Sequence, residues 1–231
     1  INEIADIRHP AVRTILEEMA FEDGMEITYN ADLPARSGLG SSSSFSVGLL
    51  NALHALKGRM ISKQDLAREA IRIEQEVMGE AVGSQDQIWA AFGGLNRIVF
   101  HRDGGFDVSP LILSSENRHA LQSSLMLFFT GFSRYASEIA QKQIDNFGHK
   151  KQELKTLGQF ADDATSILQG TGELVTNLGR LMHEAWELKR DLADGVTTPE
   201  VDDIYEAGRK AGALGGKLLG AGGGGVMVFV V

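Results

Sequence analysis

The order of segments in this 231-residue chain predicts an α+β protein with two lobes. Strand-like and helical segments share the first half, helical segments dominate from Arg134 to about Gly212, and a glycine-rich run leads into a final apolar strand. We expect the boundary near residue 114, which gives an N-terminal lobe of residues 1–113 and a C-terminal lobe of residues 114–231.

Helices in the N-terminal lobe are predicted from apolar spacing and from residues that start helices. A short helix is expected over residues 11–20, and a longer one over residues 42–57, where apolar side chains recur on one face. That face consists of Phe45, Leu49, Leu53 and Leu56. Ser62 and Asp65 form a capping-box pattern, which predicts a further helix that runs to about Met78.

Strands are predicted from alternation and from short apolar runs. Met25 to Asn30 alternate apolar and polar residues, as a half-buried strand does. Residues 95–100 and 106–113 flank a glycine-containing turn and predict a β-hairpin. The apolar runs at residues 124–131 and 226–231 predict two more strands, the first of them buried.

Composition excludes several classes of function. The formal net charge of −9 argues against a nucleic-acid surface, which needs clustered Lys and Arg. No apolar run approaches the roughly 20 residues that span a bilayer, and no signal-peptide pattern is visible. The chain has no cysteine, which excludes disulfides and thiolate metal sites and favours a reducing compartment, so we expect a cytoplasmic protein. The six histidines show no metal-ligand spacing, and we expect no zinc site.

A glycine–serine segment, PARSGLGSSSS at residues 34–44, precedes an apolar helix. The first N–H groups of a helix lack partners and carry partial positive charge. Glycine lets a ligand approach those amides closely, and serine hydroxyls can bond phosphate oxygens or ligate Mg²⁺. The simpler interpretations are a flexible linker and a serine N-cap that follows a turn.

Two familiar phosphate-binding loops do not fit this segment. A Walker A loop has Lys followed by Ser or Thr after its last glycine, and no such Lys is present. A Rossmann fingerprint follows its strand directly and is succeeded by a helix and another strand, whereas here residues 34–37 intervene and a second helix follows.

The segment resembles the Pro-x-x-x-Gly-Leu-Gly-Ser-Ser signature of the GHMP kinases, the superfamily of galactokinase, homoserine kinase, mevalonate kinase and phosphomevalonate kinase. A second run, KLLGAGGGGVMVF, resembles the C-terminal glycine motif of that superfamily, at Gly220, Gly222, Gly224 and Gly225. Leu219 departs from the pattern, since many members carry Ser or Thr there. The resemblance implies an N-terminal lobe like domain 2 of ribosomal protein S5 and a ferredoxin-like, helical C-terminal lobe, each incomplete in this chain.

The resemblance also implies ATP and Mg²⁺ as cofactors. The residues expected to bind ATP are Pro34, Arg36, Ser37, Gly38, Leu39, Gly40, Ser41, Ser42, Ser43, Ser44, Gly220 and Gly222. Arg36 could instead contact the sugar. Glu74 lies at the spacing from Asp86 at which these kinases carry a Mg²⁺-ligating Glu, so Glu74 and Ser42 are expected to hold the metal. A solvated acidic face is the alternative for Glu74 and its neighbours Glu76 and Glu80.

Asp86 is the expected catalytic residue. It follows a Gly-Ser-Gln turn and precedes an apolar helical run, so its carboxylate should lie at a helix start. A residue that merely stabilises the helix dipole would look the same. Galactokinase-like members carry Gly-x-x-Asp-Gln at this point, with the Asp against the substrate hydroxyl. The resemblance therefore implies that Asp86 is a catalytic base or orients the hydroxyl.

The wider sequence resembles the D-glycero-D-manno-heptose 7-phosphate kinases of this superfamily, in LPARSGLGSSSSF, VGSQDQIWAAFGGLNRI, FFTGFSRYASEIA and GGKLLGAGGGG. This implies phosphorylation of the anomeric hydroxyl of a sugar phosphate to give heptose 1,7-bisphosphate. Runner-up substrates are fucose and an N-acetylhexosamine. The residues expected to bind substrate are Ser84, Gln85, Ser133, Arg134, Lys189 and Gly223. Arg134 is the expected clamp for the sugar's own phosphate, and the alternative for Arg134 and Lys189 is a role at helix ends.

The ends of the chain bear on its activity. It begins at Ile1 and ends at Val231 inside an apolar run, so we expect a fragment of a longer protein. These kinases carry sugar-binding segments before the equivalent of Ile1 and continue after the last strand. A second class of function therefore stays open, a catalytically incomplete GHMP-fold protein that binds nucleotide or sugar. Asp86, Glu74 and Ser42 favour the kinase, because a binding protein needs neither a base nor a metal site.

Overall fold

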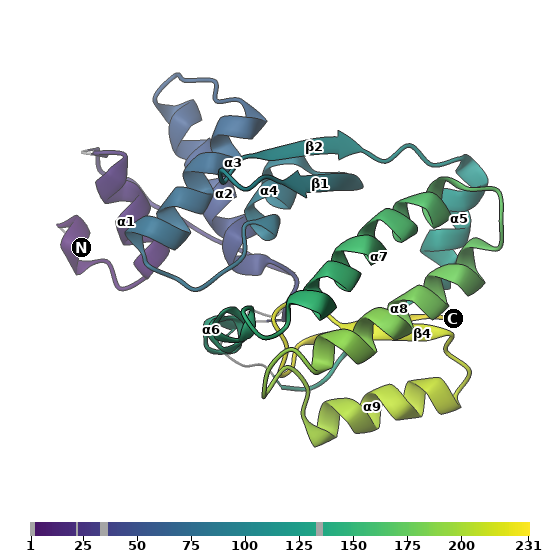
Figure 1. Ribbon diagram of the computed structural model, residues 1–231. Helices are drawn as coiled ribbons and strands as arrows, with labels where there is room; N and C mark the ends of the chain where they lie inside the picture. Colours follow the sequence, from purple (N-terminus) through teal and green to yellow (C-terminus); the bar gives the residue numbers. More distant parts are fainter. Residues whose placement is uncertain (1–2, 22, 33–36, 133–135) are drawn as a thin grey trace. The chain divides into compact units, whose positions relative to one another are not determined.

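The computed structural model describes residues 3–21, 23–32, 37–132 and 136–231 (Figure 1). It confirms an α+β fold. The chain forms two compact units, of which unit 1 comprises Ile1–Ala35 with Gly40–Gly94 and unit 2 comprises Arg36–Leu39 with Leu95–Val231. The lobe boundary near residue 114 stays a prediction.

Unit 1 is helical in its described part. Its elements are η1 (Ile4–Asp6), α1 (Pro10–Glu18), α2 (Ser41–Leu56), α3 (Lys63–Arg72), η2 (Ile73–Val77) and α4 (Gln85–Phe92). The helices predicted over residues 11–20 and 42–57 are confirmed. The capping pattern is confirmed as well, because the Asp65 N–H donates to the Ser62 hydroxyl at 3.1 Å at the start of α3.

The core of unit 1 lies between α1, α2, α3 and η2, where Ile15, Leu50, Leu53 and Ile73 are almost fully buried. The apolar face predicted for α2 is correct at Leu49 and Leu53, which are both buried. It is wrong at Leu56, which is 69 % exposed because it is the last residue of the helix.

The helix predicted to reach Met78 changes its winding after Arg72. Residues Ile73–Val77 form a π-helical turn, closed by a 2.8 Å bond from the Met78 N–H to the Ile73 carbonyl. Single π-helical turns within helices are rare and often accompany functional sites. This turn carries Glu74.

The strand predicted over Met25–Asn30 is wrong. These residues form neither helix nor strand, and Met25, Ile27 and Tyr29 are 36–56 % exposed. A segment with alternating apolar and polar residues forms a half-buried strand only where a neighbouring strand supplies hydrogen bonds. No strand of the described residues pairs with this segment.

Unit 2 contains a hairpin, a small sheet and a set of helices. Its elements are β1 (Asn96–Phe100), β2 (Phe106–Pro110), α5 (Ser115–Ser124), β3 (Leu125–Phe129), α6 (Ala136–Asn146), α7 (Lys151–Gln169), α8 (Leu174–Arg190), α9 (Pro199–Lys210), β4 (Gly215–Leu218) and β5 (Val226–Val230). The predicted hairpin is confirmed, with antiparallel register from Asn96 opposite Pro110 to Phe100 opposite Phe106. The largely helical stretch before residue 212 is confirmed too.

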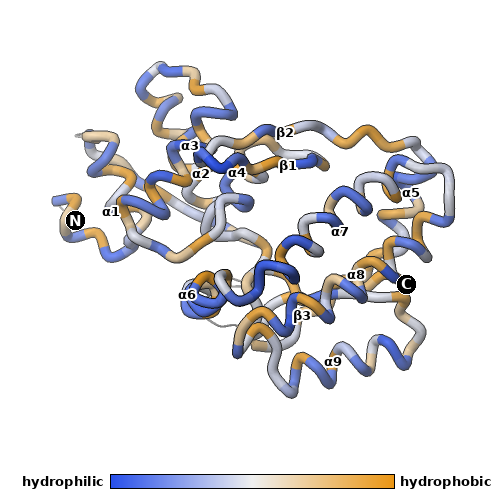
Figure 2. Tube along the Cα trace, viewed as in Figure 1, coloured by the Kyte–Doolittle hydropathy of each residue, from blue (hydrophilic) through white to orange (hydrophobic). Residues whose placement is uncertain are grey.

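The sheet of unit 2 has the strand order β3-β5-β4, with both neighbouring pairs antiparallel. The central strand β5 is buried throughout. Its Met227 and Phe229 pack with Trp186 of α8 and Tyr205 of α9. Hydrophilic and hydrophobic residues alternate along α9, as expected for a helix that covers a sheet on one side (Figure 2).

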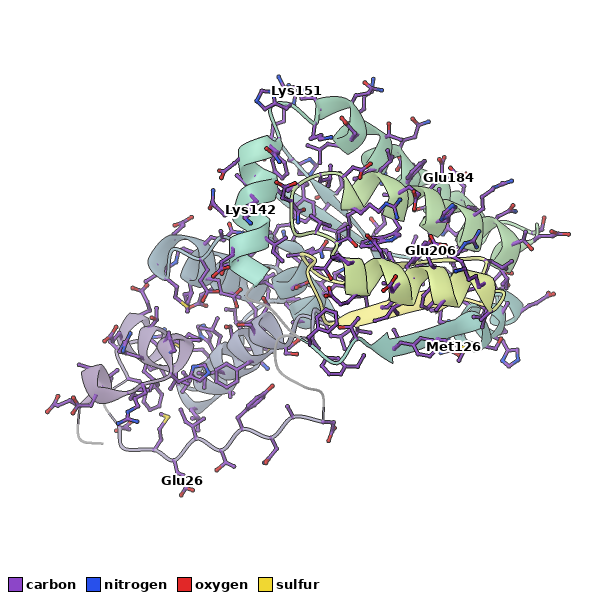
Figure 3. All side chains as sticks on the ribbon, turned by 90° about the horizontal axis from the view of Figure 1, so that it is seen from below. Glu26, Met126, Lys142, Lys151, Glu184 and Glu206 are labelled. Atoms are coloured by element: carbon purple, nitrogen blue, oxygen red, sulfur yellow. The ribbon has the colours of Figure 1, made fainter. Side chains whose placement is uncertain are left out.

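The strand predicted at residues 124–131 is confirmed, but its predicted burial is wrong. The side chains of β3 are 37–62 % exposed. The reason is its position, since β3 is an edge strand that pairs only with β5 among the described residues. Figure 3 shows β3, marked by Met126, along the outer edge of the sheet.

Candidate active site

The start of α2 has no side-chain cap. Its N-cap residue is Gly40, in the left-handed region with φ +70°, and a glycine has no side chain that could accept a bond from the first N–H groups. The Ser44 N–H closes the first turn on the Gly40 carbonyl at 2.9 Å, so the preceding N–H groups have no intrahelical partner. The serine N-cap interpretation is therefore wrong, and the helix start has the chemistry of an anion site.

The serines after Gly40 have different environments. Ser42 and Ser44 are exposed, Ser41 is half-buried and Ser43 is buried. The Ser43 hydroxyl points into unit 1 and donates to Oε2 of Glu74 at 2.9 Å. Ser42, which was expected to share a cation with Glu74, is exposed, so its hydroxyl is accessible to a ligand.

Glu74 is a buried carboxylate, only 2 % exposed. Its Oε2 accepts bonds from Ser43 and from Nε2 of Gln87, the latter at 2.5 Å. Its Oε1 is buried and has no hydrogen-bond partner among the described residues. Glu76 is exposed, which favours Glu74 over Glu76 as the candidate metal ligand of this segment. Burial, and secondly the charge of Glu74, raise the pKa of Glu80.

The free oxygen of Glu74 fits a hard divalent cation. Buried carboxylates in proteins are usually paired or coordinate metals. Within the described ranges, no group of three or more His, Asp or Glu side chains could hold a metal ion. A cation at Glu74 would therefore complete its shell with water or phosphate oxygens, which is how Mg²⁺ is bound in kinase sites.

Asp86 lies in the first turn of α4 and is half-buried. A Cβ atom built on Gly40 would lie 3.2 Å from Cγ and 3.4 Å from Oδ2 of Asp86, so the carboxylate packs against the N-cap of α2. Burial raises the pKa of Asp86, and a hydrogen bond from the Gln85 side chain opposes this.

The turn before Asp86 is held by Gln75. Its Nε2 donates to the Val82 carbonyl at 2.9 Å and to the Ser84 hydroxyl at 3.0 Å. Gln75 therefore fixes the position of Ser84, an expected substrate-binding residue. Gln85 is exposed beside it.

The two glycine motifs of the sequence meet inside unit 2. A Cβ atom on Gly38 would lie 2.8 Å from the Leu219 carbonyl oxygen, and one on Gly220 would lie 2.8 Å from the Cα of Gly38. The Val226 N–H donates to the Ser37 carbonyl at 2.9 Å. Only glycine allows the two backbones to approach so closely.

Lys189 supports the C-terminal glycine loop, residues 219–225. Its Nζ donates to the Gly220 carbonyl at 2.5 Å and contacts the Leu218 carbonyl at 3.4 Å. Burial, and secondly the charge of Lys217, lower the pKa of Lys189 to about 7. Lys189 therefore supports the glycine loop, a role that differs from the helix-end alternative given for it, and contact with a substrate phosphate stays a prediction.

Other expected site residues are placed only in part. The Gly223 N–H donates to the Val196 carbonyl at 2.9 Å, so its amide is already bonded, and Gly222 packs against Val196. Four expected residues, Pro34, Arg36, Ser133 and Arg134, lie outside the described residues.

No role was predicted for Gln75 or Gln87, although Gln87 is the last residue of the Gly-x-x-Asp-Gln pattern. No spacing rule distinguishes Gln75 from the exposed Gln85. The roles of Gln75 and Gln87 depend on which side chains the π-helical turn and α4 bring together.

The start of α2 is thus led by a glycine and lies beside the carboxylate of Asp86. The buried carboxylate of Glu74 has one oxygen without a hydrogen-bond partner among the described residues. The chain matches the family models "GHMP kinases N terminal domain" over residues 7–94 and "GHMP kinases C terminal" over residues 173–231. The chain belongs to the GHMP kinase family.

Individual relatives support this assignment. The chain is 31 % identical over 205 residues to D-glycero-alpha-D-manno-heptose 7-phosphate kinase of Campylobacter jejuni, covering 88 % of this chain and 60 % of that protein. It is 28 % identical to mevalonate kinase of Pyrococcus horikoshii, covering 94 % and 62 %. It is also 28 % identical to the bifunctional fucokinase/GDP-fucose pyrophosphorylase of Arabidopsis thaliana, covering 94 % and 21 %.

Among solved structures, a D-glycero-D-manno-heptose 1-phosphate kinase from Bacteriodes thetaiotaomicron is similar, with a TM-score of 0.71 and 29 % identity. The match covers 96 % of this chain and 62 % of that one. The chain thus spans less than two thirds of the first relatives it matches. No helix in the described part of the chain is long and apolar enough to cross a membrane.

Proposed function

We propose that the protein to which this chain belongs is an ATP-dependent kinase that phosphorylates the anomeric hydroxyl of a sugar phosphate. D-glycero-D-manno-heptose 7-phosphate is the first candidate, because the heptose kinase of Campylobacter jejuni is similar over most of the chain. The mevalonate kinase and fucokinase relatives make other small alcohols the competing substrates. The absence of cysteine supports a cytoplasmic location.

One observation carries the proposal: the Asp86 carboxylate packs against Gly40, at the uncapped start of α2. Phosphoryl transfer needs bound phosphates beside a group that orients the attacking hydroxyl. In unit 1 the uncapped start of α2 and the Asp86 carboxylate lie next to each other, which supports this arrangement. A residue that served only the dipole of α4 would have no need to lie against another helix start.

The chemistry assigned to these residues is a single displacement. The sugar oxygen bonds to the γ-phosphorus of ATP while the bond to the β–γ bridging oxygen breaks, and Asp86 accepts the hydroxyl proton. The N–H groups at the start of α2 and the hydroxyls of Ser42 and Ser44 hold phosphate oxygens.

Glu74 and Ser42 are the residues proposed to hold Mg²⁺, and the unpartnered Oε1 of Glu74 supports this. Magnesium, when bound, neutralises charge on the ATP phosphates. Glu74 itself contributes a fixed, buried negative charge that selects a cation at this position.

The proposal is tested by incubating the full-length gene product with ATP, Mg²⁺ and a panel of free and phosphorylated sugars together with mevalonate. We expect transfer to a phosphorylated sugar, with the heptose 7-phosphate the best substrate. Turnover of mevalonate alone would overturn the sugar assignment, and no phosphoryl transfer to any alcohol would overturn the kinase.

A further inference from the structure

Three polar residues are buried together in unit 1. Glu74, from the π-helical turn, is 2 % exposed, Gln87 of α4 is fully buried and Ser43 of α2 is 6 % exposed. Each comes from a different element of unit 1, η2, α4 or α2. Polar groups buried among apolar ones are destabilising unless their bonds are satisfied.

The bonds among these residues are concentrated on one atom. Oε2 of Glu74 accepts from both the Ser43 hydroxyl and the Gln87 amide, at 2.9 Å and 2.5 Å. Oε1 of Glu74 and Oε1 of Gln87 are both buried with no hydrogen-bond partner in the described part of the chain. The arrangement therefore restrains one carboxylate oxygen and leaves two other oxygens free.

A purely structural origin does not account for this pattern. A buried carboxylate with an unpaired oxygen is among the most costly groups that a core can contain. An apolar residue at position 87 would avoid the unpaired amide oxygen, as the next residue of α4, the fully buried Ile88, does. A cation beside Glu74 would remove the cost of the unpaired carboxylate oxygen, because it supplies positive charge next to Oε1.

We infer that Gln87 is a positioning residue that, together with Ser43, holds Oε2 of Glu74 and thereby presents Oε1 to a divalent cation. This inference rests on the proposed kinase function. Gln87 acts on the cation through Glu74, since outer-shell donors fix the orientation of a carboxylate ligand. The restraint comes from α2 and α4 at once, so the ligand is oriented before the cation binds.

The test uses the full-length gene product and measures Mn²⁺ binding directly, by electron paramagnetic resonance in the presence of a non-hydrolysable ATP analogue. Gln87→Met keeps the length of the side chain and removes the donor. We expect the affinity for Mn²⁺ to fall about 10–100-fold, the range typical of outer-shell changes. We expect kcat at saturating Mg²⁺ to stay within about threefold of wild type, because no group that contacts substrate is altered.

A second pair of variants covers the case in which Gln87→Met does not fold. Ser43→Ala removes the other donor to Glu74. Ser46→Ala, on the same helix, removes a buried hydroxyl that, in the described part of the chain, bonds the Ser42 carbonyl and not Glu74. We expect Mn²⁺ affinity to fall in Ser43→Ala and to stay at the wild-type value in Ser46→Ala.

The outcomes separate this inference from the proposed function. Wild-type affinity for Mn²⁺ in folded Gln87→Met and Ser43→Ala, alongside lost affinity in Glu74→Gln, would overturn the positioning role and leave the kinase intact. An equal fall in kcat at saturating cation would also overturn it, since the residue would then act on the chemistry. A wild-type protein without cation-dependent transfer would overturn the proposed function itself.

Discussion

The Cα of Gly40 and the carboxylate of Asp86 lie so close that a Cβ atom on Gly40 would be 3.2 Å from Cγ of Asp86. Gly40 is the N-cap of α2, and Asp86 is in the first turn of α4. The contact brings a carboxylate whose pKa is raised by burial to the uncapped end of another helix. Each of the two residues leads to a prediction.

Gly40→Val should weaken nucleotide binding. The added side chain meets Asp86, and the left-handed backbone at φ +70° disfavours a β-branched residue. We expect the Kd for ATP, measured by calorimetry, to rise at least tenfold, a change of about 1.4 kcal/mol.

Gly58→Val provides the control. Gly58 has a similar φ of +66°, but a Cβ there would meet nothing within 4 Å. The two variants should lose similar stability from backbone strain, and only Gly40→Val should lose nucleotide affinity. Unchanged affinity in folded Gly40→Val would refute the anion-binding role of the α2 start.

Glu74→Gln should raise the Mg²⁺ requirement. The substitution keeps the shape of the side chain and its bonds to Ser43 and Gln87 in part, but it removes the buried negative charge. The apparent Mg²⁺ constant in a steady-state assay should rise sharply. Glu76→Gln, at an exposed position, should show the same apparent Mg²⁺ constant as wild type. The reverse pattern would make Glu76 the ligand.

Arg134→Ala should raise KM for a phosphorylated sugar and leave KM for ATP nearly unchanged, the pattern of lost ground-state binding. The reason is that a guanidinium can bind a substrate phosphate through two parallel bonds. The corresponding free sugar is the internal control, since its KM should not respond. An equal effect on both KM values would assign Arg134 to the nucleotide.

Lys189→Met should change how stability depends on pH. The pKa of Lys189 is lowered to about 7, whereas lysine in an unfolded chain titrates near 10.4. Between these values the unfolded chain binds more protons than the native one, so the free energy of unfolding rises with pH. Without Lys189 that rise should be smaller.

Urea unfolding at about pH 7 and pH 9 measures this difference. Lys142→Met, at an exposed position of α6, is the matched control. Its free energy of unfolding should rise between the two pH values by as much as that of the wild type. An equal gain in Lys189→Met would mean that Lys189 titrates normally in the native protein.

Elements with strong local signals were predicted correctly. The Ser62 cap, the buried positions Leu49 and Leu53 of α2 and the hairpin are determined by residues close together in sequence. The segment at residues 25–30 and the burial of β3 were wrong, because both depend on which strands and helices lie alongside. Period-2 alternation carries no information about a pairing partner.

The candidate site was predictable to the extent that motifs mark it. Gly40, Glu74 and Asp86 were selected from sequence, and the structure brings Gly40 and Asp86 together. The bond of Ser43 to Glu74 was not predictable, because the side of α2 that faces the π-helical turn depends on tertiary packing. The same holds for Gln87.

The kinase account depends most on Asp86. A hydroxyl is a poor nucleophile until it is oriented and its proton has an acceptor, and general-base help of this kind contributes about 10²–10⁴-fold in rate. Asp86→Asn preserves the volume and most hydrogen bonds but cannot accept the proton. A residue that only stabilised the dipole of α4 would contribute about 0.3–1 kcal/mol to folding and little to turnover.

The decisive measurement is therefore kcat of the full-length Asp86→Asn gene product with its best sugar phosphate, alongside its ATP affinity and melting temperature. The account predicts that kcat falls at least about 100-fold while ATP affinity and melting temperature stay close to wild type. Turnover near the wild-type value in that variant would contradict the account and remove Asp86 from the mechanism.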